Sequence, residues 1–204
     1  MQIVLIRHGK TAGNLEKRYV GTTDEPLCEA GIRELLQRKQ EQKYPPADLV
    51  ITSPLRRCLE TAELLYPEIP ADTRIVCEGL REMNFGLFEY QNYQELSGNP
   101  AYQAWIDGGG VGAFPGGESQ ADFERRCAAA YEELFTGVLQ KETDQQTESG
   151  EKTVALVVHG GTIMALMHHF GIPREDYFTW QCDNAQGVIC RCGAFGELLL
   201  QQKI

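Results

Sequence analysis

The chain has 204 residues, of which 42% are hydrophobic and 24% charged, and these values suit one domain with a sizeable buried core. Its net charge of −10 and pI near 4.9 argue against a general nucleic-acid binder or a basic membrane-surface protein. No segment approaches about eighteen consecutive apolar residues, so we expect no membrane span. A local arginine cluster can oppose the global charge. We therefore expect a small positive pocket on a negative protein.

The cysteines and the N-terminal run bear on the compartment. The apolar run at 3–6 has four aliphatic residues and no basic region before it, so we expect no secretory signal. The chain has seven cysteines, an odd number, and no CxxC pair. Both features predict reduced thiols in a cytoplasmic protein.

The first half of the chain alternates short apolar runs with helical patterns. The predicted strands cover 3–6, 47–51 and 74–77, and the predicted helices cover 29–42 and 53–66. The second helix would begin with Ser53 as its N-cap and Pro54 at its first helical position.

The second half contains the strongest predicted strand, TVALVV at 153–158. Before it we expect short helices within 91–106, a glycine-dense loop and a helix that runs from its cap Ser119 to about Gln140, with Asp122 in an imperfect capping box. A polar loop follows at 141–152. After the strand we expect a helix from near Thr162 and two paired terminal strands, near 187–192 and 195–201.

This order of elements predicts the fold class. Strands that alternate with helices imply crossover connections and a mostly parallel sheet with helices on both faces, which is a three-layer α/β fold. The near-continuous aliphatic strands agree, since strands buried on both faces do not alternate. The terminal strands are the candidates for antiparallel pairing. We expect one domain over 1–204, with a small helical cap at about 87–118.

Two of the four histidines stand in the same unusual context. His8 and His159 each follow an apolar strand and precede a glycine. Ligands of open α/β sheets bind beyond the carboxyl ends of the strands, so both imidazoles are expected at one site. Gly9 and Gly160 would let a ligand approach the backbone closely, and the next helix would aim N–H groups at an anion. One histidine at a strand end is usually structural, but two such histidines favour a catalytic site.

Six blocks in order carry a resemblance to a known family. They are RHG at 7–9 with Asn14, RYVGTTDEPLCEAG at 18–31, SPLRRCLETA at 53–62, LREMNFG at 80–86, PGGES at 115–119 and VHGGT at 158–162. Together they resemble the histidine phosphatase superfamily, which has the phosphoglycerate mutase-like fold. The resemblance covers the chain from residue 3 to about residue 170.

The resemblance implies three catalytic residues. His8 would be the nucleophile, since a histidine can form a covalent intermediate that splits one hard step into two. Glu82 would be the general acid, which protonates the leaving oxygen and later takes a proton from water. His159 would be the second histidine, which stabilises the transferred charge. A solvent-facing loop is the alternative for Glu82.

The resemblance also implies the phosphate ligands Arg7, Asn14, Arg57 and Gly160. A guanidinium matches two phosphoryl oxygens and keeps its charge, whereas Asn14 would be a neutral donor. Spacing alone does not choose between Arg57 and its neighbour Arg56, and the family position selects Arg57.

No metal-ligand spacing such as HExxH or DxDxDG is present. We therefore expect catalysis without a metal or an organic cofactor, with the cationic cluster supplying the charge that a metal supplies elsewhere. The expected partner is a small phosphorylated metabolite, with inorganic phosphate as product. Neither nucleic acid nor a membrane is expected as a partner.

Departures from the mutase pattern favour a phosphatase. The acid segment reads Glu-Met-Asn-Phe-Gly from Glu82, where mutases usually have Glu-Arg-His-Tyr-Gly, and Met164 lies in a stretch where mutases usually place an arginine. The mutases also carry a longer substrate-covering insertion. PGGES and the short length resemble alpha-ribazole phosphatases and fructose-2,6-bisphosphatases, whereas Phe-Glu-Tyr at 88–90 departs from their usual Trp-Glu-Gly.

Two alternative functions stay open. One is cofactor-dependent phosphoglycerate mutase-type phosphoryl transfer. The other is a non-catalytic protein that binds phosphorylated ligands, and the presence of both His8 and Glu82 argues against it.

Overall fold

The computed structural model describes residues 1–110, 112–140 and 151–204. Within them a seven-stranded sheet has the order β3-β2-β4-β1-β6-β7-β5. Its strands are β1 (Gln2–Arg7), β2 (Leu49–Thr52), β3 (Ile75–Val76), β4 (Thr153–Val158), β5 (Gly171–Ile172), β6 (Gly187–Cys192) and β7 (Leu198–Lys203). The β3-β2-β4-β1 part and the β5–β7 pair are parallel, whereas β6 runs antiparallel to both β1 and β7. The mostly parallel sheet and the antiparallel terminal pair are confirmed.

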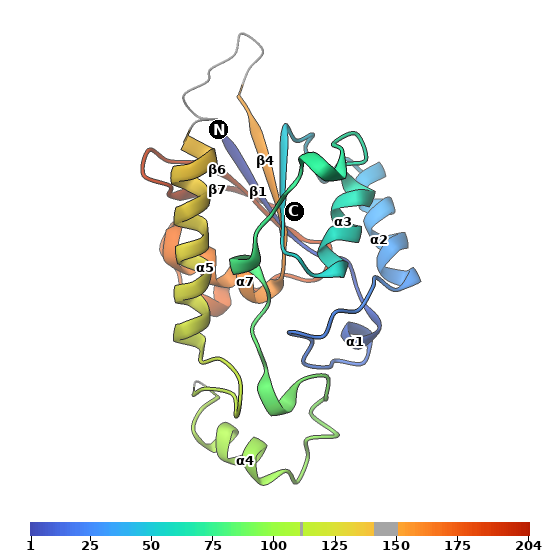
Figure 1. The fold of residues 1–204 in the computed structure, drawn as a ribbon, viewed down its shortest axis with the longest axis vertical. Coiled ribbons are helices and arrows are strands. Elements are labelled where there is room, and N and C mark those ends of the chain that lie inside the picture. The colour runs from blue at the N-terminus through green and yellow to red at the C-terminus, as the bar shows by residue number, and fades with distance from the viewer. Residues whose placement is uncertain (111, 141–150) are drawn as a thin grey trace.

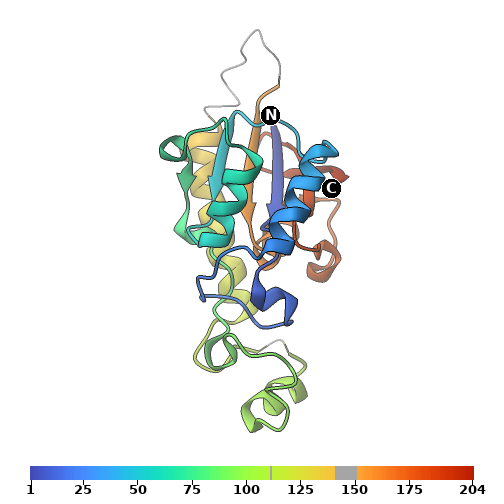
Figure 2. The same cartoon turned by 90° about the vertical axis from the view of Figure 1, so that its right-hand side faces the viewer.

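Helices cover both faces of this sheet, as the sequence predicts (Figures 1 and 2). The α-helices are α1 (Ala12–Leu15), α2 (Glu29–Gln40), α3 (Arg56–Leu65), α4 (Pro100–Asp107), α5 (Gln120–Leu134) and α7 (Gly160–Phe170). Helices α2 and α3 lie on one face of the sheet, and α5 and α7 lie on the other.

Alternation along the central strands builds a separate core on each face. In β1, Ile3 and Leu5 belong to the core that contains α5 and α7, whereas Val4 and Ile6 belong to the core of α2 and α3. Strand β4 divides in the same way. Successive strand side chains point to opposite faces, so each aliphatic residue of these runs is buried.

Two helix starts differ from the sequence prediction. Helix α3 begins at Arg56 with Leu55 as its N-cap, so the assignment of Ser53 as N-cap was wrong. The N–H of Ser53 donates to the carbonyl of Val157 at 3.1 Å, which continues the β2–β4 ladder beyond Thr52. Helix α7 begins at Gly160 rather than near Thr162, with His159 as its N-cap.

The remaining boundaries move by a few residues. Ser119 caps α5 as expected, and after Leu134 the chain continues as a π-helical turn over Phe135–Leu139. Residues 91–99 form turns before the single helix α4, and β7 starts after a turn at 193–197. Most of the predicted polar loop, 141–150, lies outside the described residues.

The parallel pairing of β1 and β4 determines where the polar strand ends meet. Its register places Arg7 opposite Val158, and the N–H of His8 donates to the Val158 carbonyl at 2.9 Å. The two carboxyl ends therefore coincide at one edge. Beyond this edge lie α1 and the segment that contains α4 (Figure 1). No helix in the described part of the chain has the length and apolarity needed to cross a bilayer.

Helix α2 packs directly on the backbone that follows His8. The N–H of Cys28, its N-cap, donates to the Lys10 carbonyl at 2.9 Å, and a Cβ at Gly31 would collide with the same carbonyl. We expect Gly31→Ala to lower the free energy of unfolding, measured in urea, by about 1–3 kcal/mol because α2 must move away. Gly137→Ala is the control, since that exposed position has open space around it. An equal effect of both substitutions would contradict this packing.

Candidate active site

The strand ends bring the two histidines together. The ring centroids of His8 and His159 are 5.1 Å apart, at an interplanar angle of 68°. Both side chains are buried, with relative exposures of 3% and 0%. The expected juxtaposition of these residues is therefore present, and it follows from the β1–β4 register.

His8 is held in one tautomer. Its Nδ1 lies 2.7 Å from the carbonyl oxygen of Gly9, and a carbonyl accepts only from a protonated nitrogen. Nδ1 therefore carries the proton and Nε2 keeps a free lone pair. Burial, together with the charges of Arg57 and Arg7, lowers the pKa of His8 well below its ordinary value. The ring is thus neutral at neutral pH.

Arg7 supplies an unsatisfied donor beside these rings. Its Nη1 donates to the carbonyl of Cys182 at 2.6 Å, whereas its Nε is buried and has no hydrogen-bond partner among the described residues. Gly160 packs against this guanidinium, and a Cβ there would lie 3.2 Å from the Arg7 Cζ. A side chain at position 160 would therefore crowd Arg7, so Gly160 contributes space as well as its backbone.

The structure chooses between the two neighbouring arginines of α3. Arg57 is fully buried, and it donates to the carbonyls of Thr23 and Gly21 at 2.7 and 2.9 Å. Its Nε is also buried without a partner. Arg56 is exposed and pairs with Glu60 at 2.7 Å. Of the two arginines, Arg57 is therefore the one that lies close enough to His8 for its charge to lower the pKa of that histidine. Its role as a phosphate ligand stays a prediction.

Glu89, which the sequence did not single out, fixes the loop of Gly21 and Thr23 that binds Arg57. One oxygen of Glu89 accepts from the Gly21 N–H, the Thr23 N–H and the Thr23 hydroxyl, at 2.8–2.9 Å. These hydrogen bonds fix the loop whose carbonyls orient Arg57. The available signal was the Phe-Glu-Tyr stretch, which keeps the glutamate of the family's Trp-Glu-Gly.

The side-chain amide of Asn14 is oriented by two hydrogen bonds to its oxygen atom. Its Oδ1 accepts from the Thr11 N–H at 3.2 Å and from Nδ2 of Asn184 at 3.1 Å, which leaves its own Nδ2 as the end that can donate to a ligand. Asn184 also donates to the His8 carbonyl at 3.1 Å. One missed side chain thus links Asn14 to the backbone of His8.

His159 contacts two further residues that were not predicted. Its Nε2 lies 2.7 Å from Oγ of Ser53 and 3.5 Å from Sγ of Cys58. Burial, followed by the charges of Arg57 and His8, lowers the pKa of His159 well below its ordinary value. Ser53 and Cys58 both lie in the SPLRRCLETA block, but their chain positions do not reveal which histidine they meet.

Glu82 completes the arrangement. Its carboxylate accepts from the Met83 N–H at 2.8 Å and from the Gly161 N–H at 3.2 Å. Burial raises the pKa of Glu82 above its ordinary value, although these N–H groups and the two arginines oppose the shift. The first turn of α7 therefore uses one of its free N–H groups on this carboxyl.

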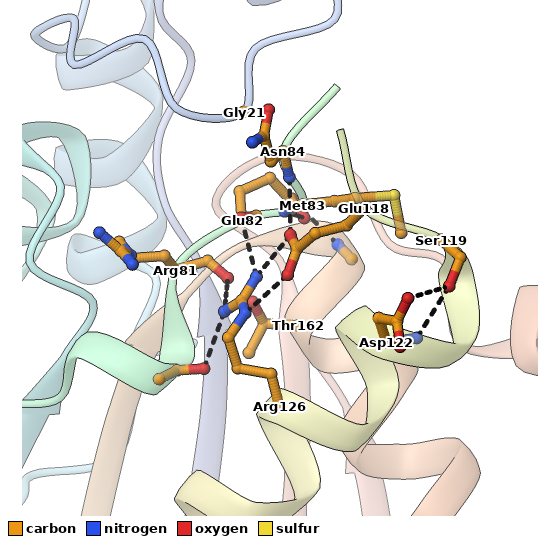
Figure 3. Close-up of polar contacts among 12 residues, drawn as sticks. Gly21, Arg81, Glu82, Met83, Asn84, Glu118, Ser119, Asp122, Arg126 and Thr162 are labelled. Carbon is orange, nitrogen blue, oxygen red and sulfur yellow. Dashed lines mark hydrogen bonds and ion pairs between the residues drawn. The ribbon is translucent and has the colours of Figure 1, made fainter. Parts of the chain in front are cut away.

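A partly buried ion pair fixes the loop around Glu82 (Figure 3). Arg126 of α5 donates to the carbonyls of Gly79, Arg81 and Glu82 at 3.0–3.3 Å and to both oxygens of Glu118 at 2.8 Å. Glu118, from the PGGES block, also accepts from the Asn84 N–H at 2.8 Å. One guanidinium thus ties the backbone on both sides of Glu82 to α5.

These groups suit a tetrahedral anion. Among the described residues, the buried Nε atoms of Arg7 and Arg57 have no hydrogen-bond partner. Burial is the main cause that lowers the pKa of both histidines and raises the pKa of Glu82. Fixed donors in a water-poor site stabilise a phosphoryl group strongly. Among the described residues, no group of three or more His, Cys, Asp or Glu side chains could hold a metal ion. Independence from a metal stays a prediction.

Comparison with known proteins identifies the family and agrees with the α/β fold. The family profile described as "Histidine phosphatase superfamily (branch 1)" matches residues 3–201. The chain belongs to this superfamily, whose members are phosphatases or mutases that work through a phosphohistidine.

Relatives of this chain carry names for two activities. It is 34% identical over 134 residues to the Proteus mirabilis protein named "Probable phosphoglycerate mutase GpmB", a match that spans 64% of this chain and 61% of the relative. The solved alpha-ribazole phosphatase of Shigella flexneri has 24% identity and a TM-score of 0.77, with 98% and 95% of the chains covered. The solved phosphoglycerate mutase of Thermus thermophilus has 24% identity and a TM-score of 0.69, and the match covers 100% of this chain and 98% of that one. The two solved structures share the fold.

The ion pair of Arg126 can be tested by a conservative substitution. We expect Arg126→Lys to lower the free energy of unfolding by about 1.5–3 kcal/mol, since one ammonium cannot replace the planar donors on three carbonyls and a carboxylate. Arg125→Lys on the same helix is the control, because Arg125 is exposed and pairs with Asp122 on the surface. Urea titration of both variants measures the difference. Equal stabilities would show that the Arg126 contacts contribute nothing.

Proposed function

We propose that this protein is a phosphomonoesterase that hydrolyses a small phosphorylated metabolite through a phosphohistidine, with alpha-ribazole phosphate as a candidate substrate. The observation that carries the proposal is the state of His8. Its Nδ1 proton is held by the Gly9 carbonyl, so Nε2 is free to attack, and the two arginines beside it carry unpaired Nε donors.

In the first step, Nε2 of His8 attacks the phosphorus atom and the ester P–O bond breaks. Glu82 gives its proton to the leaving oxygen, so the product leaves as a neutral alcohol. The raised pKa of Glu82 supports this role, because it keeps the acid protonated closer to neutral pH. The low pKa of His8 keeps the nucleophile unprotonated.

In the second step, a water molecule attacks the phosphorus atom of the phosphohistidine. The Glu82 carboxylate takes a proton from this water, the P–N bond breaks, and inorganic phosphate leaves with His8 regenerated. Arg7, Arg57, His159, the Asn14 amide and the Gly160 backbone bind the phosphoryl oxygens in both steps and stabilise the charge that develops on them.

A phosphoglycerate mutase-type activity is the second candidate, and the names of the curated relatives favour it. The two reactions differ in what attacks the phosphohistidine: water in a phosphatase, a second substrate hydroxyl in a mutase. The acid segment supports the phosphatase, because Met83 and Asn84 stand where mutases usually carry Arg and His. A mutase would exchange phosphate between positions of one substrate and release little free phosphate.

The proposal includes a single domain with a cap formed by residues 87–118. Trp105 and Phe114 of this segment line the same cavity as Arg7 and Glu82, which supports a role in covering the substrate. The proposed location is the cytoplasm, and seven cysteines without a disulfide are consistent with a reducing compartment.

Removal of the nucleophile tests the reaction. We expect His8→Ala to lower kcat/KM for phenyl phosphate by at least about 10³-fold, since no covalent intermediate can form. Phosphate release measures the rate. Mass spectrometry of wild-type enzyme quenched in alkaline denaturant should detect one added phosphoryl group, because the P–N bond of a phosphohistidine survives in base but not in acid. His168→Ala is the control, because His168 lies on the exposed side of α7 and pairs with Glu124 of α5. Undiminished hydrolysis by His8→Ala would contradict the mechanism.

The pH profile tests Glu82. The free enzyme needs this carboxyl protonated, so kcat/KM for an alkyl phosphate should fall as pH rises through its raised pKa. We expect Glu82→Gln to remove this limb and to lower the rate by about 10²–10⁴-fold. The same substitution should lower the rate of nitrophenyl phosphate hydrolysis much less, because the leaving oxygen of nitrophenol needs no proton.

Glu78→Gln is the matched control, since Glu78 is exposed in the segment before Glu82. An alkaline limb that persists in Glu82→Gln would assign the acid to another residue.

A further inference from the structure

A cavity of about 360 Å³ opens beside the candidate site, a volume suited to a small organic group. Arg7, Glu82, Gly160 and Gly161 form one end of it. The family motifs describe this end and the phosphate. The rest of the wall comes from residues outside the proposed catalytic set, and their chemistry bears on the group that the phosphate is attached to.

The charges of this cavity are confined to its catalytic end. Among the lining residues that the structure describes, Arg7 and Glu82 carry the charges. Gln120 and Gln181 contribute neutral amides, and the other side chains are aromatic or apolar. A second phosphate or a carboxylate on the substrate would lose its water here without gaining a cation, which is unfavourable.

The wall of the cavity is largely aromatic. Its rings come from four parts of the chain and are Tyr19, Phe85, Trp105, Phe114, Tyr177 and Phe178. Phe114 stacks on Trp105 at a centroid distance of 4.8 Å and meets Phe85 edge-on at 5.0 Å. These contacts hold one another in place, so the wall needs little rearrangement to receive a flat group.

The side chain of Phe178 leaves apolar surface of this wall exposed to solvent. It lines the cavity, yet its side chain is 67% exposed. It belongs to the 3₁₀ turn η5 (Tyr177–Trp180), whose tyrosine and tryptophan rings are buried. A ligand ring that covers Phe178 would remove this surface from water, which favours binding.

We infer that the leaving group of the natural substrate is an uncharged aromatic group, and that the substrate carries a single phosphate. The phosphate occupies the arginine and histidine site, the ring fills the aromatic cavity, and the amides of Gln120 and Gln181 meet its polar edge. This inference rests on the proposed phosphomonoesterase function and names its substrate class. It separates the chain from enzymes for bisphosphates and for phosphorylated carboxylic acids.

Two pairs of esters with matched aliphatic leaving oxygens test it. The value of kcat/KM should be about 10- to 100-fold higher for 2-phenylethyl phosphate than for ethyl phosphate, because only the first buries a ring. It should be at least about 10-fold lower for 3-phosphoglycerate than for glycerol 3-phosphate, because only the first brings a carboxylate into the cavity. Phosphate release measures all four.

Variants of the wall test the same point independently of folding. We expect Phe178→Ala to lower the ratio of phenylethyl to ethyl ester by about 10-fold. Gln181→Lys should raise kcat/KM for 3-phosphoglycerate relative to that for glycerol 3-phosphate by about 10-fold, a gain that a misfolded variant would not give. Tyr93→Ala, an exposed aromatic of the proposed cap outside the lining, should leave both ratios unchanged.

The outcomes separate the inference from the proposed function. Equal kcat/KM for the two alkyl esters, or a preference for 3-phosphoglycerate over glycerol 3-phosphate, overturns the aromatic subsite. In either case the phosphomonoesterase function still stands if His8→Ala no longer hydrolyses these esters. Hydrolysis that persists in His8→Ala, or no hydrolysis of any of the four esters, overturns the proposed function and the inference with it.

Discussion

The parallel pairing of β1 with β4 is the constraint on which the candidate site depends. It places Arg7 opposite Val158, so the residues that follow, His8 and His159, leave the sheet side by side. Both strands are buried on both faces, so a slip of one residue would move each aliphatic side chain of a strand into the opposite core, where the neighbouring side chains have other shapes. The packing that specifies the register therefore also specifies the distance between the two imidazoles. Precision at the site comes from the packing of the core.

The electrostatics of the site depend on how its arginines are held. Arg7 is anchored by the carbonyl of Cys182, and Arg57 is anchored by the carbonyls of Thr23 and Gly21. Neither guanidinium pairs with a carboxylate in the part of the chain that the structure describes. A carbonyl orients a guanidinium without cancelling its charge. The site therefore keeps two positive charges in a chain whose net charge is −10, and these charges, added to burial, hold both histidines neutral. The carboxylate of Glu89 acts one step further out, on the loop that supplies two of these carbonyls.

The sequence predicted the parts of this site that are local and missed those that depend on distant contacts. The strands, and the histidine that follows each, could be read from apolar runs and their ends. Ser53 was assigned to a helix cap because serine before proline is a common helix start, but its hydroxyl meets His159, which is 106 positions away. The link from Glu89 to Gly21 spans 68 positions, and that from Arg126 to Glu82 spans 44. Periodicity and spacing describe neighbours along the chain, so they cannot show which loop a buried charge will hold.

The division of the site into two halves explains why the family is clear and the substrate is not. The phosphate half is built from strand ends and helix starts, where the motifs lie and where geometry tolerates little change. The other half is built from the loop after β1, the 87–118 segment and the turn at 177–180, and aromatic rings from these parts complete the cavity. Connecting segments such as these tolerate sequence change better than the strands of a sheet do. One phosphoryl-transfer chemistry can thus serve different leaving groups, and relatives with the same fold can differ in substrate. In this chain the second half is lined mainly by aromatic and apolar side chains, and this lining is the physical basis of the proposed selectivity for a ring.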